Sequence, residues 1–308
     1  MSVLALKKRC DVNDVQNYRG ELKLSEPMSK HTSWRVGGPA DRYFRPADMD
    51  DLCAFMRSLA DDEPVTWVGL GSNLLVRDGG VRGTVIATSG VLNELQLIDA
   101  NTVRAEAGVS CAKVARFAAN QQLTGAEFLA GIPGTVGGAL AMNAGAFGGE
   151  TWDIVASVEM LTHNGDIIGK DKANFEIGYR SVKGLSGAWF SAAHFKLQKG
   201  DTVAAKSKIR ELLNKRNQTQ PTNLPNAGSV FRNPDNDYSA RLIEVSGLKG
   251  YRIGGAEVSV KHANFIVNTG SATASDIESL INHVHDTVLQ KHGVDLVREV
   301  RIIGETKV

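Results

Sequence analysis

The 308-residue sequence contains three cysteines, Cys10, Cys53 and Cys111, and no Cys-x-x-Cys pair. An odd number of scattered cysteines argues against a disulfide framework and against a zinc site, and favours a reducing compartment. No apolar run approaches the ~18 residues that a membrane-spanning helix needs. The amino-terminal residues also lack an apolar stretch of signal-peptide length. We therefore expect a cytoplasmic protein without membrane insertion.

The sequence also lacks an excess of either sign of charge. Lys and Arg together number 35, Asp and Glu number 34, and the net charge is +1. This balance argues against a nucleic-acid partner, although a small anionic ligand needs only a local basic cluster. His283 and His285 lie two residues apart on a predicted helix and face different directions, so no metal site is predicted.

Apolar periodicity predicts several helices, with capping residues at some of their ends. The predicted helices are one after Asp48, one after Ser110, one over 203–216, one over 238–246, and one over 275–292 that Ser275 and Glu278 cap and Gly293 ends.

Strand-like runs lie between these helices and predict two hairpins, one turning near Ala100 and one at Asn164-Gly165. The last strand is predicted within 294–303. The mixture is α+β rather than a regular βαβ alternation. The chain length favours two or three domains, and we place a boundary near residue 203.

Glycine is abundant, with 32 residues, and residues 131–150 read GIPGTVGGALAMNAGAFGGE with one charge, Glu150. Seven glycines exceed what turns alone need, which suggests main chain in close contact with a flat or phosphorylated ligand. GLGSNLLV at 69–76 follows a predicted strand, but Leu74 occupies the third glycine position of a dinucleotide fingerprint. Its main-chain amides, with Ser72 and Asn73, suit a phosphate. Composition does not distinguish a flavin from a nucleotide.

These two stretches resemble the flavin-binding signature of the UDP-N-acetylenolpyruvylglucosamine reductase family. Three later stretches are similar to further motifs of that family: EIGYRS at 176–181, NAGSVFRNP at 226–234 and LVREVRIIG at 296–304. The resemblance covers residues 21–304 in the family's order. Asn226 stands where Ser is common, and Arg232 where Lys is common. The short stretch between 150 and 180 resembles the subclass that lacks an extra Tyr-bearing loop.

The resemblance implies a two-lobed FAD-binding domain of the vanillyl-alcohol-oxidase type and a smaller α+β substrate-binding domain. We expect the FAD-binding domain over 1–202, with lobes 1–90 and 91–202, the substrate domain over 203–293, and a returning carboxyl-terminal strand over 294–308. It also implies that the chain binds FAD non-covalently, takes hydride from NADPH, and reduces UDP-N-acetylglucosamine enolpyruvate to UDP-N-acetylmuramate. We expect a monomer.

The family's site residues map onto matching positions of this sequence. Arg180 would bind the enolate, Ser229 would donate a proton, and Glu299 would stay protonated beside the enolate. Without the motifs, Arg180 would be interpreted as a surface arginine, Ser229 as a turn serine, and Glu299 as part of a surface ion-pair strip. The implied flavin contacts are Gly69, Gly71, Ser72, Asn73, Leu74, Ile132, Pro133, Gly134, Thr135, Gly137, Gly138, Asn143 and Gly145. The candidate substrate contacts are Tyr179, Arg232, Asn233, Lys261 and His262.

Two other functions stay open at this stage. Another FAD-dependent oxidoreductase of the same fold would act on hydroxy acids or alcohols, often with the flavin tethered to His or Cys. A non-enzymatic nucleotide-binding module would keep the glycine-rich stretches but would not need Arg180, Ser229 and Glu299 together. The GSVFRNP and EVR motifs favour the reductase.

Overall fold

A computed structural model describes residues 18–307 of the chain, so Cys10 lies outside the described residues. The described chain divides into two compact units. Unit 1 comprises 18–23, 43–69 and 84–214, and unit 2 comprises Leu24–Arg42, Leu70–Gly83 and 215–307. This division follows contacts rather than function, so the expected domain boundaries at 202 and 293 stay a prediction.

The centre of unit 1 is a five-stranded sheet in the order β12-β11-β15-β7-β6, in which all neighbours are antiparallel. Its strands are β6 (Leu95–Leu97), β7 (Thr102–Glu106), β11 (Val155–Leu161), β12 (Ile167–Asp171) and β15 (Trp189–Lys196). Both predicted hairpins are confirmed. Gly165 in the β11–β12 turn has φ +73°, a left-handed conformation that favours glycine.

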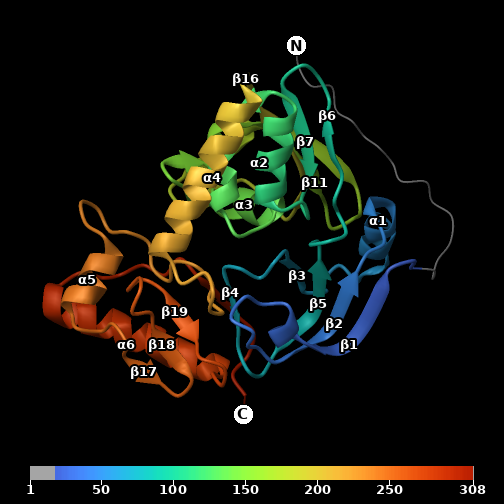
Figure 1. Cartoon of the computed structure of the whole chain (residues 1–308). Helices are drawn as coiled ribbons and strands as arrows, with labels where there is room; N and C mark the ends of the chain where they lie inside the picture. Colours follow the sequence, from blue (N-terminus) through green and yellow to red (C-terminus); the bar gives the residue numbers. More distant parts are fainter. Residues whose placement is uncertain (1–17, 308) are drawn as a thin grey trace. The chain divides into compact units, whose positions relative to one another are not determined.

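Three helices lie on one face of this sheet (Figure 1). They are α2 (Cys111–Asn120), α3 (Val136–Met142) and α4 (Thr202–Thr219). Ser110 caps α2 as predicted, because its side chain accepts a hydrogen bond from Lys113 N. Strand alternation directs Val103 and Ala105 toward the helices, and both are fully buried there. The core of unit 1 therefore supports α3, which belongs to the glycine-rich segment.

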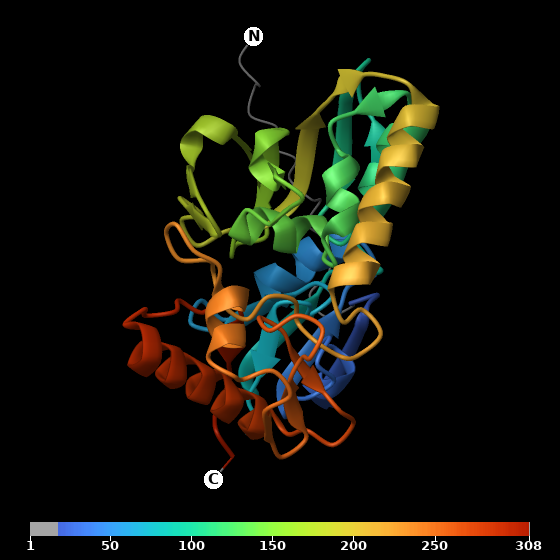
Figure 2. The same cartoon turned by 60° about the vertical axis from the view of Figure 1, so that its left-hand side comes forward.

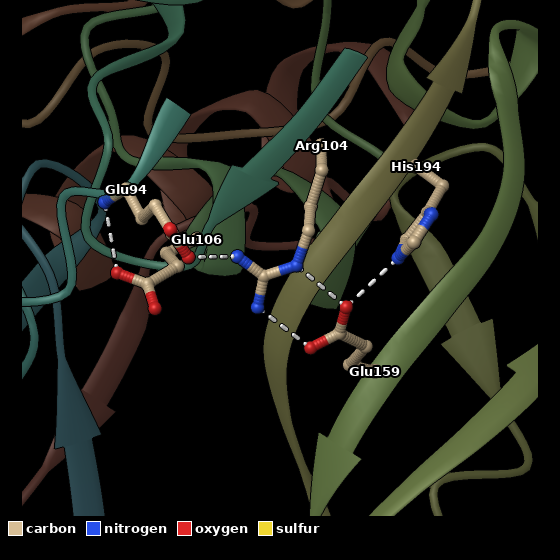
Figure 3. A network of polar contacts seen from close by, with 5 residues as sticks. All are labelled: Glu94, Arg104, Glu106, Glu159 and His194. Carbon is tan, nitrogen blue, oxygen red and sulfur yellow. Dashed lines mark hydrogen bonds and ion pairs between the residues drawn. The ribbon is translucent and has the colours of Figure 1, made fainter. Parts of the chain in front are cut away.

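The opposite face of the sheet carries a charged network (Figure 3). Arg104 donates to both carboxylate oxygens of Glu159 at 2.7 and 2.8 Å and to Glu94 at 2.6 Å. His194 Nε2 lies 2.8 Å from Glu159 Oε1, and Glu106 accepts from Glu94 N. Burial alone would raise the pKa of Glu159, but hydrogen bonds from Arg104 and His194 outweigh it and lower this pKa to about 2.

Unit 1 has a second, smaller core around α1 (Met49–Ser58), which Asp48 caps as predicted. Phe44 and Phe55 stack there with ring centroids 3.8 Å apart. The described residues also form a sheet, not assigned to one unit, in the order β1-β2-β5-β3, in which β3 runs parallel to β5. Its strands are β1 (Glu21–Pro27), β2 (Pro39–Arg45), β3 (Val65–Val68) and β5 (Val81–Ala87).

Short elements complete unit 1. Three two-stranded pairs are β8 (Leu123–Thr124) with β16 (Gln198–Lys199), β9 (Gly145–Ala146) with β10 (Gly149–Glu150), and β13 (Glu176–Gly178) with β14 (Ser181–Lys183). Single 3-10 turns occupy Glu127–Gly131, Thr151–Asp153 and Lys172–Asn174, and unit 2 has one at Met28–Lys30.

Unit 2 packs α6 (Ala274–His292) against a small antiparallel sheet, and α5 lies next to α6 in both views (Figures 1 and 2). The remaining elements are α5 (Ser239–Val245), β17 (Arg252–Ile253), β18 (Ala256–Val258) and β19 (Ile266–Asn268). Strand β4 (Leu74–Val76) runs parallel to β20 (Arg301–Ile303), with Leu74 opposite Arg301. The carboxyl-terminal residues thus lie beside the first glycine-rich stretch.

The start of α6 differs from the prediction. Thr273, not Ser275, is the capping residue, and it forms the reciprocal pair with Asp276. The main-chain amide of Ser275 instead donates to Asp78, and Glu278 forms a bidentate ion pair with Arg77. The sequence contains two overlapping capping patterns, Thr273 with Asp276 and Ser275 with Glu278. The first caps the helix, and residues of the second form tertiary contacts with Arg77 and Asp78.

The last predicted strand is shorter than expected, because regular pairing is confined to Arg301–Ile303. Leu296 and Val300 are buried in the core of unit 2, whereas Val297 is 57% exposed. Within residues 18–307, no helix is both long and apolar enough to cross a membrane. The same described residues contain no His, Cys, Asp or Glu cluster suited to a metal.

Candidate functional site

The glycine-rich segment of unit 1 forms a short helix between two turns. Its helix, α3, begins after Thr135 and buries Val136 and Leu140. Asn143 ends α3 in a left-handed conformation with φ +46°, and the chain then turns through Gly148 between β9 and β10. The small residues therefore allow a short helix to be followed directly by a tight turn.

Several glycines of this unit are required by packing within the unit itself. A Cβ on Gly131 would lie 2.4 Å from the Phe147 ring, and one on Gly137 would lie 2.9 Å from the Cβ of Ala107. A Cβ on Gly69 would meet Thr135 Oγ1 at 2.3 Å. The two glycine-rich stretches thus touch at Gly69 and Thr135. Packing therefore requires glycine at these three positions whether or not their main chain also contacts a ligand.

Gly138 differs from these packed glycines. It is exposed, and a Cβ there would find only Thr135 Oγ1, at 3.8 Å. Ile132 is buried, whereas Pro133 is exposed and Gly134 is half-buried. The surface of this part of unit 1 is therefore main chain and small side chains, which permits close approach of a flat ligand.

Arg180 projects from the two-residue turn of hairpin β13–β14, beside Tyr179. Its φ of +54° is uncommon for a residue other than glycine and costs on the order of 1 kcal/mol. The guanidinium donates to the main-chain oxygens of Asn143 and Gly145, both at 3.3 Å, and lies 4.9 Å from the centroid of the Tyr179 ring. The structure thus brings the Tyr-Arg motif onto the glycine-rich segment.

Asn143 and Glu150 complete this arrangement. Asn143 is 1% exposed, and its amide donates to Glu150 Oε2 at 2.7 Å and to Gly178 O at 3.2 Å. Its side-chain oxygen accepts from Trp152 N at 3.1 Å. Glu150 Oε1 lies 3.9 Å from Arg180 Nη1. Sequence reasoning missed Glu150, although it is the only charge in residues 131–150.

Unit 2 brings Ser229 and Glu299 onto neighbouring segments. The amide of Glu299 donates to Val230 O at 2.8 Å, one residue beyond Ser229. Both Ser229 and Glu299 are half-buried, and the adjacent Val230 and Val300 are anchored in the core. Segments 70 positions apart in the sequence thus pair within unit 2.

The glycine-rich stretch at 69–76 flanks the same segment. Arg301 N donates to Asn73 O at 3.0 Å, and Asn73 Nδ2 donates to Glu299 O at 3.2 Å. Gly71 has φ +59°, and a Cβ there would lie 2.1 Å from His31 O. Ser72 and Leu74, both half-buried, lie on either side of Asn73. Within unit 2, residues predicted for the flavin and for proton transfer therefore occupy one region.

The candidate substrate residues of unit 2 lie in two loops. Asn233 accepts from Ser239 N at the start of α5, and Arg232 N donates to Val297 O. Lys261 is exposed and donates from Nζ to Asn217 O at 2.5 Å. Burial lowers the pKa of the neighbouring His262, whose Nδ1 has no hydrogen-bond partner among the described residues. The lowered pKa favours the neutral form of this imidazole.

Two family models match the chain. Residues 40–169 match the model described as "FAD binding domain", and residues 220–303 match "UDP-N-acetylenolpyruvoylglucosamine reductase, C-terminal domain". A curated UDP-N-acetylenolpyruvoylglucosamine reductase of Alkalilimnicola ehrlichii is 56% identical, over 94% of this chain and 96% of its own. The chain belongs to the UDP-N-acetylenolpyruvoylglucosamine reductase family.

Other members of this reductase family agree. The reductase of Methylococcus capsulatus is 56% identical over 94% of this chain and 95% of its own. The crystal structure of the Thermus caldophilus reductase superposes with a TM-score of 0.78 at 32% identity and covers 93% of this chain. The α+β fold with an FAD-binding domain is therefore confirmed, and the chain is an FAD-dependent oxidoreductase.

FAD fits the residues that the structure describes. The glycine-rich segment lies within the matched FAD-binding region, and its exposed part presents main chain rather than bulky side chains. Ser229 and Glu299 lie within the matched carboxyl-terminal domain, whereas Arg180 lies between the two matched regions. The individual flavin and substrate contacts stay predictions.

Proposed function

We propose that the chain catalyses the NADPH-dependent reduction of UDP-N-acetylglucosamine enolpyruvate to UDP-N-acetylmuramate, a step of peptidoglycan precursor synthesis. The shared name of the similar reductases and the matched FAD-binding region support this proposal. Bound FAD supplies the chemistry of hydride transfer, from NADPH to the β-carbon of the enolpyruvyl group. Gly69, Thr135 and Gly138 are the residues we assign to hold it through main-chain contacts.

The observation that carries the proposal is the pairing of the segments of Ser229 and Glu299. Hydride addition at the β-carbon leaves negative charge on the carboxylate side, and the α-carbon then needs a proton. Ser229 donates that proton from its hydroxyl group. The main-chain amide of Glu299 donates to Val230 O at 2.8 Å, next to Ser229 in the sequence, and we assign its protonated carboxyl group to hydrogen-bond the developing enolate.

Arg180 binds the substrate carboxylate. A guanidinium stays charged at any working pH and forms two parallel hydrogen bonds with a carboxylate. The main-chain oxygens of Asn143 and Gly145 hold its two terminal nitrogens at 3.3 Å, so the group is oriented before the substrate arrives. Orientation in advance reduces the entropy lost on binding.

The basic and polar residues around the remaining candidates suit the sugar nucleotide. A diphosphate carries two negative charges, and Lys261 and Arg232 offer cations for them. Asn233 and Tyr179 provide hydrogen-bonding groups, and His262 offers a neutral ring nitrogen. NADPH carries a further phosphate, so the same cations serve both ligands in turn.

Spectroscopy of the purified protein tests this function. NADPH should bleach the flavin absorption without oxygen, and UDP-N-acetylglucosamine enolpyruvate should restore it. A flavin that NADPH does not reduce, or that this substrate does not reoxidise, would contradict the proposal. Acid precipitation should release the FAD into the supernatant, and colour that stays with the pellet would instead indicate the covalent flavin of a hydroxy-acid or alcohol oxidase.

A further inference from the structure

The side chain of Asn143 is fully engaged by the protein. Its amide nitrogen donates two hydrogen bonds, to Glu150 Oε2 and to Gly178 O, and its oxygen accepts one from Trp152 N. The side chain is 1% exposed. Its polar atoms are therefore directed at three protein segments, which differs from the flavin contact that the motif implied for this residue.

The contacts between Asn143 and the hairpin β13–β14 run in both directions. The Asn143 amide binds Gly178 O, two residues before Arg180 in the hairpin. The Arg180 guanidinium in turn binds the main-chain oxygen of Asn143. Two unusual backbones meet here, since Asn143 has φ +46° and Arg180 has φ +54°. Strained conformations of this kind persist when surrounding contacts hold them in place.

Glu150 connects the same two residues electrostatically. Its Oε2 accepts from Asn143, which holds the carboxylate with Oε1 at 3.9 Å from Arg180 Nη1. The guanidinium thereby has a fixed anionic neighbour and two fixed carbonyl acceptors. Each of these groups depends on the position of Asn143.

We propose that Asn143 is a positioning residue that orients Arg180 for the substrate carboxylate and does not itself bind the flavin through its side chain. This inference rests on the proposed function, because it assigns Arg180 to that carboxylate. Asparagine suits the position for two reasons. It tolerates the left-handed conformation better than most residues, and its amide supplies the donors that aspartate lacks.

The test uses the FAD-bound enzyme and the variant Asn143→Gly. Glycine keeps the left-handed backbone without strain and removes all three side-chain hydrogen bonds. The matched control is Gln122→Gly, an exposed residue with φ +57° just beyond α2 in the same unit. Asn143→Asp is a second variant that keeps the size of the side chain, removes its donors and places a second carboxylate against Glu150.

Four quantities are measured: the flavin content, the rate of flavin reduction by NADPH, the rate of reoxidation by UDP-N-acetylglucosamine enolpyruvate, and the affinity of the oxidised enzyme for that substrate by calorimetry. In Asn143→Gly and Asn143→Asp, we expect substrate affinity and the reoxidation rate to fall about tenfold or more. Flavin content and the reduction rate should stay within about twofold of wild type. Gln122→Gly should match wild type in all four.

A double-mutant cycle with Arg180→Ala separates positioning from general support of the fold. If Asn143 acts through Arg180, adding Asn143→Gly to Arg180→Ala should cost little further substrate affinity. Fully additive losses, or loss of flavin from both Asn143 variants, would overturn the inference. Unchanged substrate affinity and reoxidation in the single variants would also overturn it. Failure of the wild type to use the substrate would instead refute the proposed function.

Discussion

Replacing Glu159 with glutamine probes the charged network on the face of the unit 1 sheet opposite its helices (Figure 3). Glu159 bridges β11 to β7 through Arg104 and to β15 through His194. Its pKa lies at about 2 in the folded protein, against 4.5 for an unperturbed glutamate. One pKa unit is worth about 1.4 kcal/mol, so the charged form of Glu159 stabilises the fold by about 3 kcal/mol.

The sign of the pH dependence follows from this lowered pKa. The stabilisation is fully present above pH 4.5 and is lost as the pH falls toward 2, because the unfolded state then binds the proton first. Burial raises the pKa of the neighbouring Glu106, and the charge of Glu159 adds to that rise, so Glu159→Gln also relieves a smaller, opposing contribution. Glu159→Gln should therefore lower the free energy of unfolding by about 3 kcal/mol at pH 7, and the difference should shrink below pH 4.5.

Urea denaturation between pH 7 and pH 3 measures this difference. The control is Glu176→Gln, whose exposed ion pair with Lys183 should contribute little. A stability of Glu159→Gln that equals wild type at pH 7 would refute the reasoning. So would a deficit that stays constant down to pH 3.

Two further predictions concern the glycine-rich segment and the Ser229 region. Gly137→Ala should destabilise the flavin-free protein in thermal melts, because its Cβ would lie 2.9 Å from the Cβ of Ala107. Gly138→Ala should leave that stability unchanged but weaken FAD binding in a flavin titration. Equal effects of the two alanines in both assays would contradict this assignment. Asn264→Ala should slow flavin reoxidation more than flavin reduction, because the Asn264 side chain pairs with both the N–H and the carbonyl of Phe231, two residues beyond Ser229. The comparably buried Asn268→Ala, which loses contacts to Trp34 and Gly270, should lower the melting temperature without that selectivity, and equal slowing in both variants would argue against it.

Local rules predicted much of the secondary structure. Asp48, Ser110 and Gly293 mark helix ends as expected, and the Asn164-Gly165 turn forms its hairpin, because each depends on neighbours in sequence. The predicted start of α6 was wrong because Asp78, about 200 residues away in the sequence, accepts hydrogen bonds from the main-chain amides of Ala274 and Ser275. No local pattern carries that contact.

The candidate site shows the same division. The motifs indicated Ser229 and Glu299, and their proximity within unit 2 follows from a pairing that a single sequence does not encode locally. The abundance of glycine in residues 131–150 suggested close approach of a ligand, and the packing of Gly131 and Gly137 against Phe147 and Ala107 is a second reason for glycine that the sequence did not reveal. The orientation of the Asn143 side chain could not be predicted, because its partners depend on how the hairpin β13–β14 folds back.

The proposed role of Ser229 is to protonate the α-carbon of the substrate after hydride has been added to the β-carbon, and the Ser229→Ala variant isolates this role. Rapid-mixing measurements without oxygen would follow the two half-reactions separately. We predict that reduction by NADPH stays close to wild type while reoxidation by UDP-N-acetylglucosamine enolpyruvate falls by about a hundredfold or more, as expected for loss of a general acid. Equal loss in both half-reactions, or normal reoxidation, would contradict it.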